Sequence, residues 1–126
     1  MFITIDEGDR RPIYQQVADE IKGLIAAGEL QEGASLPPIR QVAADLGVNL
    51  NTIAVAYRRL RNEGLVKIRH GAGAVVISRT FTETTEAQLR SLLATALTHL
   101  VLAGLSPAEV RALVEKELAN LFRDVR

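Results

Sequence analysis

Two short amphipathic segments that meet at Gly47 constrain the fold more than any other feature of this sequence. Apolar residues recur at helical spacing over residues 38–46, and Gly47 is suited to end that helix. Asn49, only two residues later, is a good N-cap for a second helix that runs to about Asn62. The residues expected to face the core are Ile39, Val42, Ala43 and Leu46, then Ile53, Ala56, Tyr57 and Leu60. Two helices joined by so short a turn predict a helix-turn-helix.

The segments on either side complete this unit. An apolar stripe of Ile13, Val17, Ile21, Leu24 and Ile25 predicts a helix over about 12–27, and residues 2–5 are either a short strand or an extended arm. After Gly64, residues 65–69 alternate apolar and basic side chains, and residues 74–77 are apolar. The glycines between them suit a hairpin tip. A helix-turn-helix followed by a hairpin is the winged-helix pattern.

A polar stretch, residues 78–85, predicts a boundary between two parts of the chain. Leucine-rich helical spacing follows over about 84–103, and Gly104 ends it. Ser106 and Glu109 then have the spacing of a capping box for a last helix. The predicted fold is therefore mainly α with a small β-hairpin: a winged helix-turn-helix DNA-binding domain over 1–78 and a two-helix dimerisation region over 79–126.

The last two helices cannot enclose enough apolar surface by themselves. They either pack back on the first domain or pair with a second copy, and a two-fold dimer is the commonest assembly. The residues expected at the dimer interface are Leu89, Leu92, Leu93, Leu97, Leu100, Leu113, Leu118, Leu121 and Phe122.

Charge is unevenly distributed although the net charge is zero. Residues 1–35 carry 3 basic and 7 acidic side chains, whereas residues 36–80 carry 7 basic and 2 acidic ones. Residues 81–126 carry 5 basic and 6 acidic side chains. A positive middle segment is either a solvated face or a surface that attracts an anionic partner.

Composition argues against several other classes of protein. The chain has no cysteine and two histidines, His70 and His99, so we expect no metal site and no disulfide. It contains no glycine-rich phosphate loop and no Ser–His motif, so we expect neither an enzyme nor a cofactor. No apolar run reaches the roughly 18 residues of a membrane span, and the first residues do not resemble a signal peptide. The expected location is the cytoplasm, with no membrane partner.

The second helix of a helix-turn-helix enters the major groove of double-stranded DNA, and its first residues meet base edges. Asn51 can pair with adenine, and Thr52 can reach a base or a phosphate. Basic side chains on this helix and the hairpin suit phosphates. The candidate DNA-binding residues are Arg40, Asn51, Thr52, Arg58, Arg59, Arg61, Lys67, Arg69, His70 and Gly71.

Seven blocks in order resemble the GntR family of bacterial transcription regulators. They are PIYQQ at 12–16, GELQEG at 28–33, LPPIRQVA at 36–43, LGVNLNT at 46–52, YRRL at 57–60, EGL at 63–65 and RHGAG at 69–73. The N-x-N-T form of the second helix of the helix-turn-helix and the short two-helix tail resemble the YtrA subfamily.

The resemblance implies a homodimeric winged-helix repressor that binds an inverted-repeat operator, in genes that often adjoin transporter genes. It also implies DNA contacts by Arg40, by Asn49, Asn51 and Thr52, and by His70 and Gly71 in the wing. The chain departs from the family at Pro38, which replaces the usual Ser or Thr cap, and at Ala72, where a basic residue is common. Two alternatives stay open: a regulator with a small-molecule site at the dimer interface, and a winged-helix module that binds protein.

Overall fold

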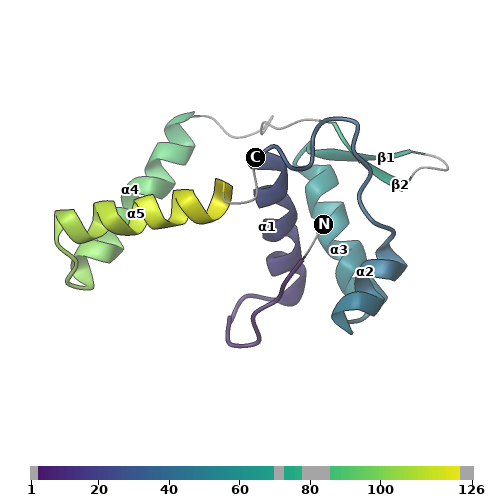
Figure 1. Ribbon diagram of the computed structural model, residues 1–126, viewed down its shortest axis with the longest axis horizontal. Helices are drawn as coiled ribbons and strands as arrows, with labels where there is room; N and C mark the ends of the chain where they lie inside the picture. Colours follow the sequence, from purple (N-terminus) through teal and green to yellow (C-terminus); the bar gives the residue numbers. More distant parts are fainter. Residues whose placement is uncertain (1–2, 70–72, 78–85, 123–126) are drawn as a thin grey trace. The chain divides into compact units, whose positions relative to one another are not determined.

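The computed structural model describes residues 3–69, 73–77 and 86–122. Within these residues, five helices and one antiparallel hairpin form the regular secondary structure (Figure 1). In chain order they are α1 (Ile13–Ala26), α2 (Ile39–Leu46), α3 (Leu50–Asn62), β1 (Val66–Arg69), β2 (Gly73–Val76), α4 (Glu86–Leu102) and α5 (Pro107–Phe122). The predicted mainly α fold with a small hairpin is confirmed.

The chain divides into two compact units, residues 1–82 and 83–126, which we call unit 1 and unit 2. The division falls within residues 78–85, which the sequence predicts as a boundary and which lie outside the described residues. Unit 1 contains α1, α2, α3 and the hairpin, and unit 2 contains α4 and α5.

The core of unit 1 forms where α1, α2 and the hairpin meet α3 (Figure 1). The predicted inward face of α3 is confirmed, since its members are at most 3% exposed; they are Ile53, Ala56, Tyr57 and Leu60. Helix α1 contributes Val17, Ile21 and Ile25. Ile13 departs from the predicted stripe and is 37% exposed, because it is the first residue of α1 and lies at the end of the packed face.

The turn between α2 and α3 is fixed at both ends. Gly47 has φ 68° and ψ 33°, a left-handed conformation that glycine adopts at low cost, and it ends α2 as predicted. The Asn49 side chain accepts a hydrogen bond from the backbone N–H of Asn51 at 2.7 Å, so the predicted N-cap is confirmed. Val48 packs partly buried against the core. The sequence of this turn therefore sets the angle at which α3 is presented.

The hairpin is extended by the segment before α2. Val66 pairs with Val76 and Arg69 with Gly73 between β1 and β2. On the other side of β2, the N–H of Leu36 donates to the carbonyl of Ala74, and the N–H of Gly33 donates to the carbonyl of Val76, both at 2.8 Å. The chain that leads into α2 is thereby attached to the hairpin.

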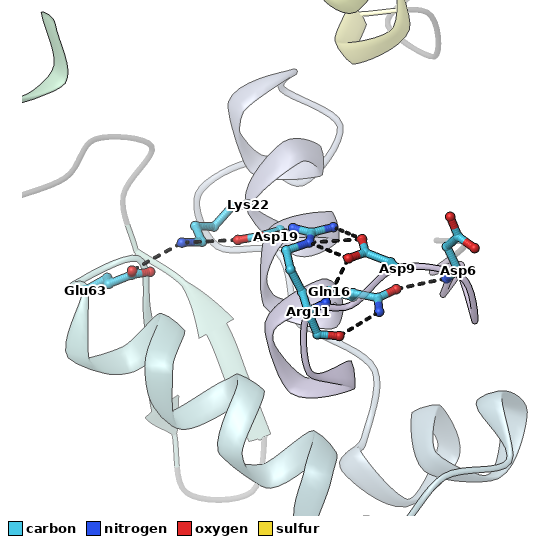
Figure 2. Close-up of polar contacts among 7 residues, drawn as sticks. All are labelled: Asp6, Asp9, Arg11, Gln16, Asp19, Lys22 and Glu63. Atoms are coloured by element: carbon cyan, nitrogen blue, oxygen red, sulfur yellow. Dashed lines mark hydrogen bonds and ion pairs between the residues drawn. The ribbon is translucent and has the colours of Figure 1, made fainter. Parts of the chain in front are cut away.

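Gln16 attaches the chain before α1 to that helix, although glutamine is usually a surface residue (Figure 2). Its side chain is 4% exposed; it accepts from the N–H of Asp6 at 2.8 Å and donates to the carbonyl of Arg11 at 3.0 Å. Ile3 and Ile5 pack partly buried on the core without forming a strand. Residues 3–5 are therefore the extended arm rather than a strand.

Unit 2 is a pair of helices, α4 and α5, joined by a short turn. The predicted capping box is confirmed: Ser106 N–H donates to Glu109 Oε1 at 3.0 Å, and Glu109 N–H donates to Ser106 Oγ at 3.2 Å. Hydrogen bonding from the Ser106 backbone, followed by hydrogen bonding from the Ser106 side chain, lowers the pKa of the Glu109 carboxyl. No helix among the described residues is long and apolar enough to cross a membrane.

Candidate nucleic-acid interface

Exposed cations lie on the helix-turn-helix and on the first strand of the hairpin. Arg40 lies in the first turn of α2, and the arginines of α3 lie in its second half. Lys67 and Arg69 lie on β1. All six side chains are exposed: Arg40, Arg58, Arg59, Arg61, Lys67 and Arg69. Within the described part of the chain none of them makes an ion pair, and Arg59 lies over the Tyr14 ring at 5.6 Å.

Cations in the acidic N-terminal segment behave differently (Figure 2). Arg11 pairs with Asp9 at 2.7 Å and with Asp19 at 2.5 Å. Lys22 pairs with Asp19 at 3.6 Å and with Glu63 at 3.2 Å. The hydrogen bond from the Arg11 side chain lowers the pKa of Asp9. Among the described residues, Arg11 and Lys22 of the acidic segment are therefore paired with carboxylates, whereas the six exposed cations on α2, α3 and β1 are not.

The first turn of α3 presents side chains suited to base edges. Asn51 is exposed, Thr52 is half-buried and Leu50 is 42% exposed. Ala54 and Val55, which follow along the same helix, are half-buried. Asn49 is exposed, but its side-chain oxygen serves as the cap of α3, which leaves the amide nitrogen as the group to offer a phosphate.

Tyr57 connects α3 to the residues just before α2. Its hydroxyl donates a hydrogen bond to the carbonyl of Pro37 at 2.5 Å, and the residue is 3% exposed. Burial raises the pKa of Tyr57 to about 12. Sequence reasoning placed Tyr57 in the core but missed this bond, because helical spacing carries no information about a hydroxyl at the far end of a ring.

Two hollows adjoin these cations. One of about 290 Å³ lies between α1 and α3 and is lined by Tyr14, Val55, Arg58, Arg59 and Asn62. The other, of about 530 Å³, lies between the start of α2 and the hairpin, with Arg40 and Ile68 among its walls. Neither resembles a metal site, since no group of three His, Cys, Asp or Glu residues in the described ranges is placed to hold an ion.

The sequence model of the bacterial regulatory proteins of the gntR family matches residues 13–76, the helix-turn-helix and its hairpin. The chain belongs to the gntR family. The HTH-type transcriptional repressor YtrA of Bacillus subtilis (strain 168) is 31% identical over 87 residues, which cover 69% of this chain and 67% of the repressor. The chain spans 28% and 15% of two further curated relatives.

The chain also resembles solved structures, and one of them covers more of the chain than the family match to residues 13–76 does. A transcriptional antiterminator from Listeria monocytogenes EGD-e has TM-score 0.83 and 30% identity over 97% of this chain and 92% of its own. The DNA-binding domain of AraR, solved with operator ORE1, has TM-score 0.51 and 26% identity over 60% of this chain and 93% of its own. This gntR-family chain is therefore a DNA-binding regulator of transcription, and its relatives are regulators rather than enzymes.

Two predicted wing residues, His70 and Gly71, lie outside the described residues. Those of β1 next to them, Lys67 and Arg69, are exposed. The structure thus describes the positions of the predicted DNA-binding residues from Arg40 to Arg69, and the role of all of them in DNA binding stays a prediction.

The residues predicted to form the dimer interface of this gntR-family chain divide into two sets. Leu97, Leu100 and Leu113 are half-buried within unit 2. The other six are 39–66% exposed; they are Leu89, Leu92, Leu93, Leu118, Leu121 and Phe122.

Proposed function

We propose that this chain is a sequence-specific repressor that binds an inverted-repeat operator as a homodimer. The observation that supports this most directly is the set of exposed cations on α2, α3 and β1, which make no ion pair among the described residues, together with the exposed Asn51 in the first turn of α3. A helix-turn-helix places that turn at base edges, and cations beside it face the phosphates.

Each predicted residue has a role in this proposal. Asn51 and Thr52 read bases, and Asn49 positions α3 as well as meeting a phosphate. His70 and Gly71 contact DNA from the wing, as the family resemblance implies, and a slim turn of this kind suits the minor groove. The remaining residues hold phosphates and supply affinity without sequence choice: Arg40, Arg58, Arg59, Arg61, Lys67 and Arg69.

Unit 2 is the proposed dimerisation region. Its exposed leucines favour burial against another apolar surface, and unit 2 of a second copy offers the same apolar surface. Pairing would set the two α3 helices about 34 Å apart, or a multiple of that, to meet successive turns of one DNA face. The repressor name of the YtrA relative supports the sign of regulation.

The test is a salt titration of the chain on operator and on random duplexes. Arg40→Ala is expected to weaken both by about 1–3 kcal/mol and to lower the slope of log affinity against log salt by about 1. The matched control is Arg11→Ala, because Arg11 is already paired with Asp9 and Asp19. Equal losses in the two variants would contradict the proposed surface.

Base reading is tested separately with Asn51→Ala. This variant should lose about 1–3 kcal/mol on the operator, found by footprinting upstream of the protein's own gene, and much less on random duplex. The salt slope should not change, because no phosphate contact is removed. Equal losses on both duplexes would argue against base reading by Asn51.

A further inference from the structure

Ile68 is an apolar residue left open on a surface that otherwise carries charge. Val66 and Ile68 share one face of β1, because side chains alternate along a strand. Val66 is fully buried in the core, whereas Ile68 is 56% exposed. Its cross-strand neighbour is Ala74, whose side chain is too small to cover it. Ile68 therefore forms one wall of the 530 Å³ groove beside α2.

The opposite wall of this groove is held in place and carries one cation. Pro38, Ile39 and Arg40 line it, and the guanidinium of Arg40 makes no ion pair within the described ranges. The bond from Tyr57 to the Pro37 carbonyl attaches this wall to α3. The bond from the Leu36 N–H to the Ala74 carbonyl attaches it to the hairpin that carries Ile68. The two walls thus have a fixed spacing.

We propose that this groove receives one sugar–phosphate unit of the DNA backbone, with the phosphate on Arg40 and the apolar face of the deoxyribose on Ile68. The inference rests on the proposed function and adds a contact to it. A deoxyribose offers carbon-bound hydrogens next to an anionic phosphate, which matches an apolar wall opposite a single cation. The groove is partly open to solvent, which suits one unit of a polymer; a small ligand favours a site that buries most of its surface.

Ile68 and Arg40 then contribute in distinguishable ways. A phosphate contact releases counterions, so its loss changes the salt slope. An apolar contact with a sugar releases none, so its loss weakens binding equally at every salt concentration. Neither contact carries base information, so both losses should be alike on operator and random duplexes.

The experiment measures affinity of the full chain for both duplexes over a range of salt. Ile68→Ala is expected to weaken binding by about 3- to 10-fold on both duplexes with an unchanged slope. Ile77→Ala is the matched control, because Ile77 is 40% exposed just beyond β2 and is not among the residues that line the groove. The affinity of this variant for both duplexes should stay within about twofold of that of the unchanged chain. Ile68→Met keeps an apolar side chain of similar size and should retain affinity, while Ile68→Gln should not.

Each other outcome overturns the inference in a recognisable way. If the unchanged chain binds with a steep salt dependence but Ile68→Ala behaves like Ile77→Ala, the groove holds no sugar. If Ile68→Ala lowers the salt slope as Arg40→Ala does, its effect runs through the phosphates. If Ile68→Ala changes only the sedimentation of the chain, Ile68 belongs to a protein interface. If the unchanged chain shows no salt-dependent binding, the proposed function itself fails.

Discussion

The helices of units 1 and 2 both carry many apolar residues, but these are buried in unit 1 and mostly exposed in unit 2. In unit 1, Ile21, Leu60 and Val66 are fully buried. In unit 2, Leu92, Leu93 and Leu102 are 66%, 57% and 79% exposed, and Val110 is the buried hydrophobic residue among those described there. The positions of apolar residues in the sequence indicate which side chains favour burial. Whether they are buried within the same chain depends on how many helices and strands pack together. Three helices and a hairpin close a core, and two helices do not.

The largest expected effect tests the self-sufficient core of unit 1. Leu60→Ala should lower its free energy of unfolding by about 2–5 kcal/mol, because a fully buried leucine leaves a cavity. The loss should not depend on protein concentration. Leu102→Ala in unit 2 is the control and should cost less than about 0.5 kcal/mol in the same urea titration. Similar costs for the two leucines would remove the contrast between the units.

The next effect tests whether a second copy covers unit 2. Leu93→Glu should weaken self-association by at least about 100-fold, since it places an unpaired charge in an apolar contact. Sedimentation over a range of concentrations measures this. Ser91→Glu is the control, because Ser91 lies off the predicted apolar stripe of α4. A Leu93→Glu chain that still sediments as a dimer would show that the interface lies elsewhere.

A smaller effect concerns the hydroxyl inside the core of unit 1. Burial raises the pKa of Tyr57 from 10.0 to about 12, so the folded chain holds this proton more tightly than the unfolded chain. The contribution of this group to the free energy of unfolding is fully present below pH 10. As the pH rises from about 10 to about 12, the free energy of unfolding falls by about 2 kcal/mol. Tyr57→Phe should lack this loss. At neutral pH the same variant should be about 1–2 kcal/mol less stable, because the Pro37 carbonyl loses its donor.

Urea unfolding at a series of pH values measures the free energy of unfolding of the unchanged chain and of Tyr57→Phe. If the two free energies depend on pH in the same way, this role of Tyr57 is contradicted. The comparison with Tyr57→Phe is needed because other groups of the chain also titrate in that range.

The smallest expected effect separates stability from DNA binding within unit 1. Asn49→Ala should cost about 1 kcal/mol of stability through loss of the α3 cap. Asn49→Asp keeps a capping oxygen and should keep the stability, while its charge repels the phosphates and weakens DNA binding. Thermal unfolding and duplex affinity, measured on both variants, distinguish the two roles. A stable Asn49→Asp chain with unchanged affinity would place Asn49 away from the DNA.

Most of unit 1 could be predicted because its local signals agree. Gly47 ends α2, Asn49 caps α3, and the face of α3 from Ile53 to Leu60 is buried as its spacing predicts. Each of these depends on residues within one or two turns of the chain, which a sequence displays directly. The family resemblance is likewise confirmed by the match to residues 13–76.

What the sequence did not predict depends on partners far apart in the chain. Gln16 is buried because Asp6 and Arg11 lie on either side of its amide, and no spacing rule indicates that. Lys22 and Glu63 come together across 41 residues. Exposure of Ile68 follows from the small size of Ala74 opposite it, which requires the register of the hairpin. The roles of the site residues remain predictions for the experiments above.

The separation of paired from unpaired cations has a practical consequence for handling this protein. A chain with zero net charge would ordinarily bind weakly to charged chromatography media. Here the exposed arginines of α2, α3 and β1 should retain it on heparin, and should carry fragments of cellular nucleic acid through the first purification steps. Because the chain has no tryptophan and two tyrosines, its own ultraviolet absorbance is weak, and such fragments would dominate the spectrum unless they are removed at high salt.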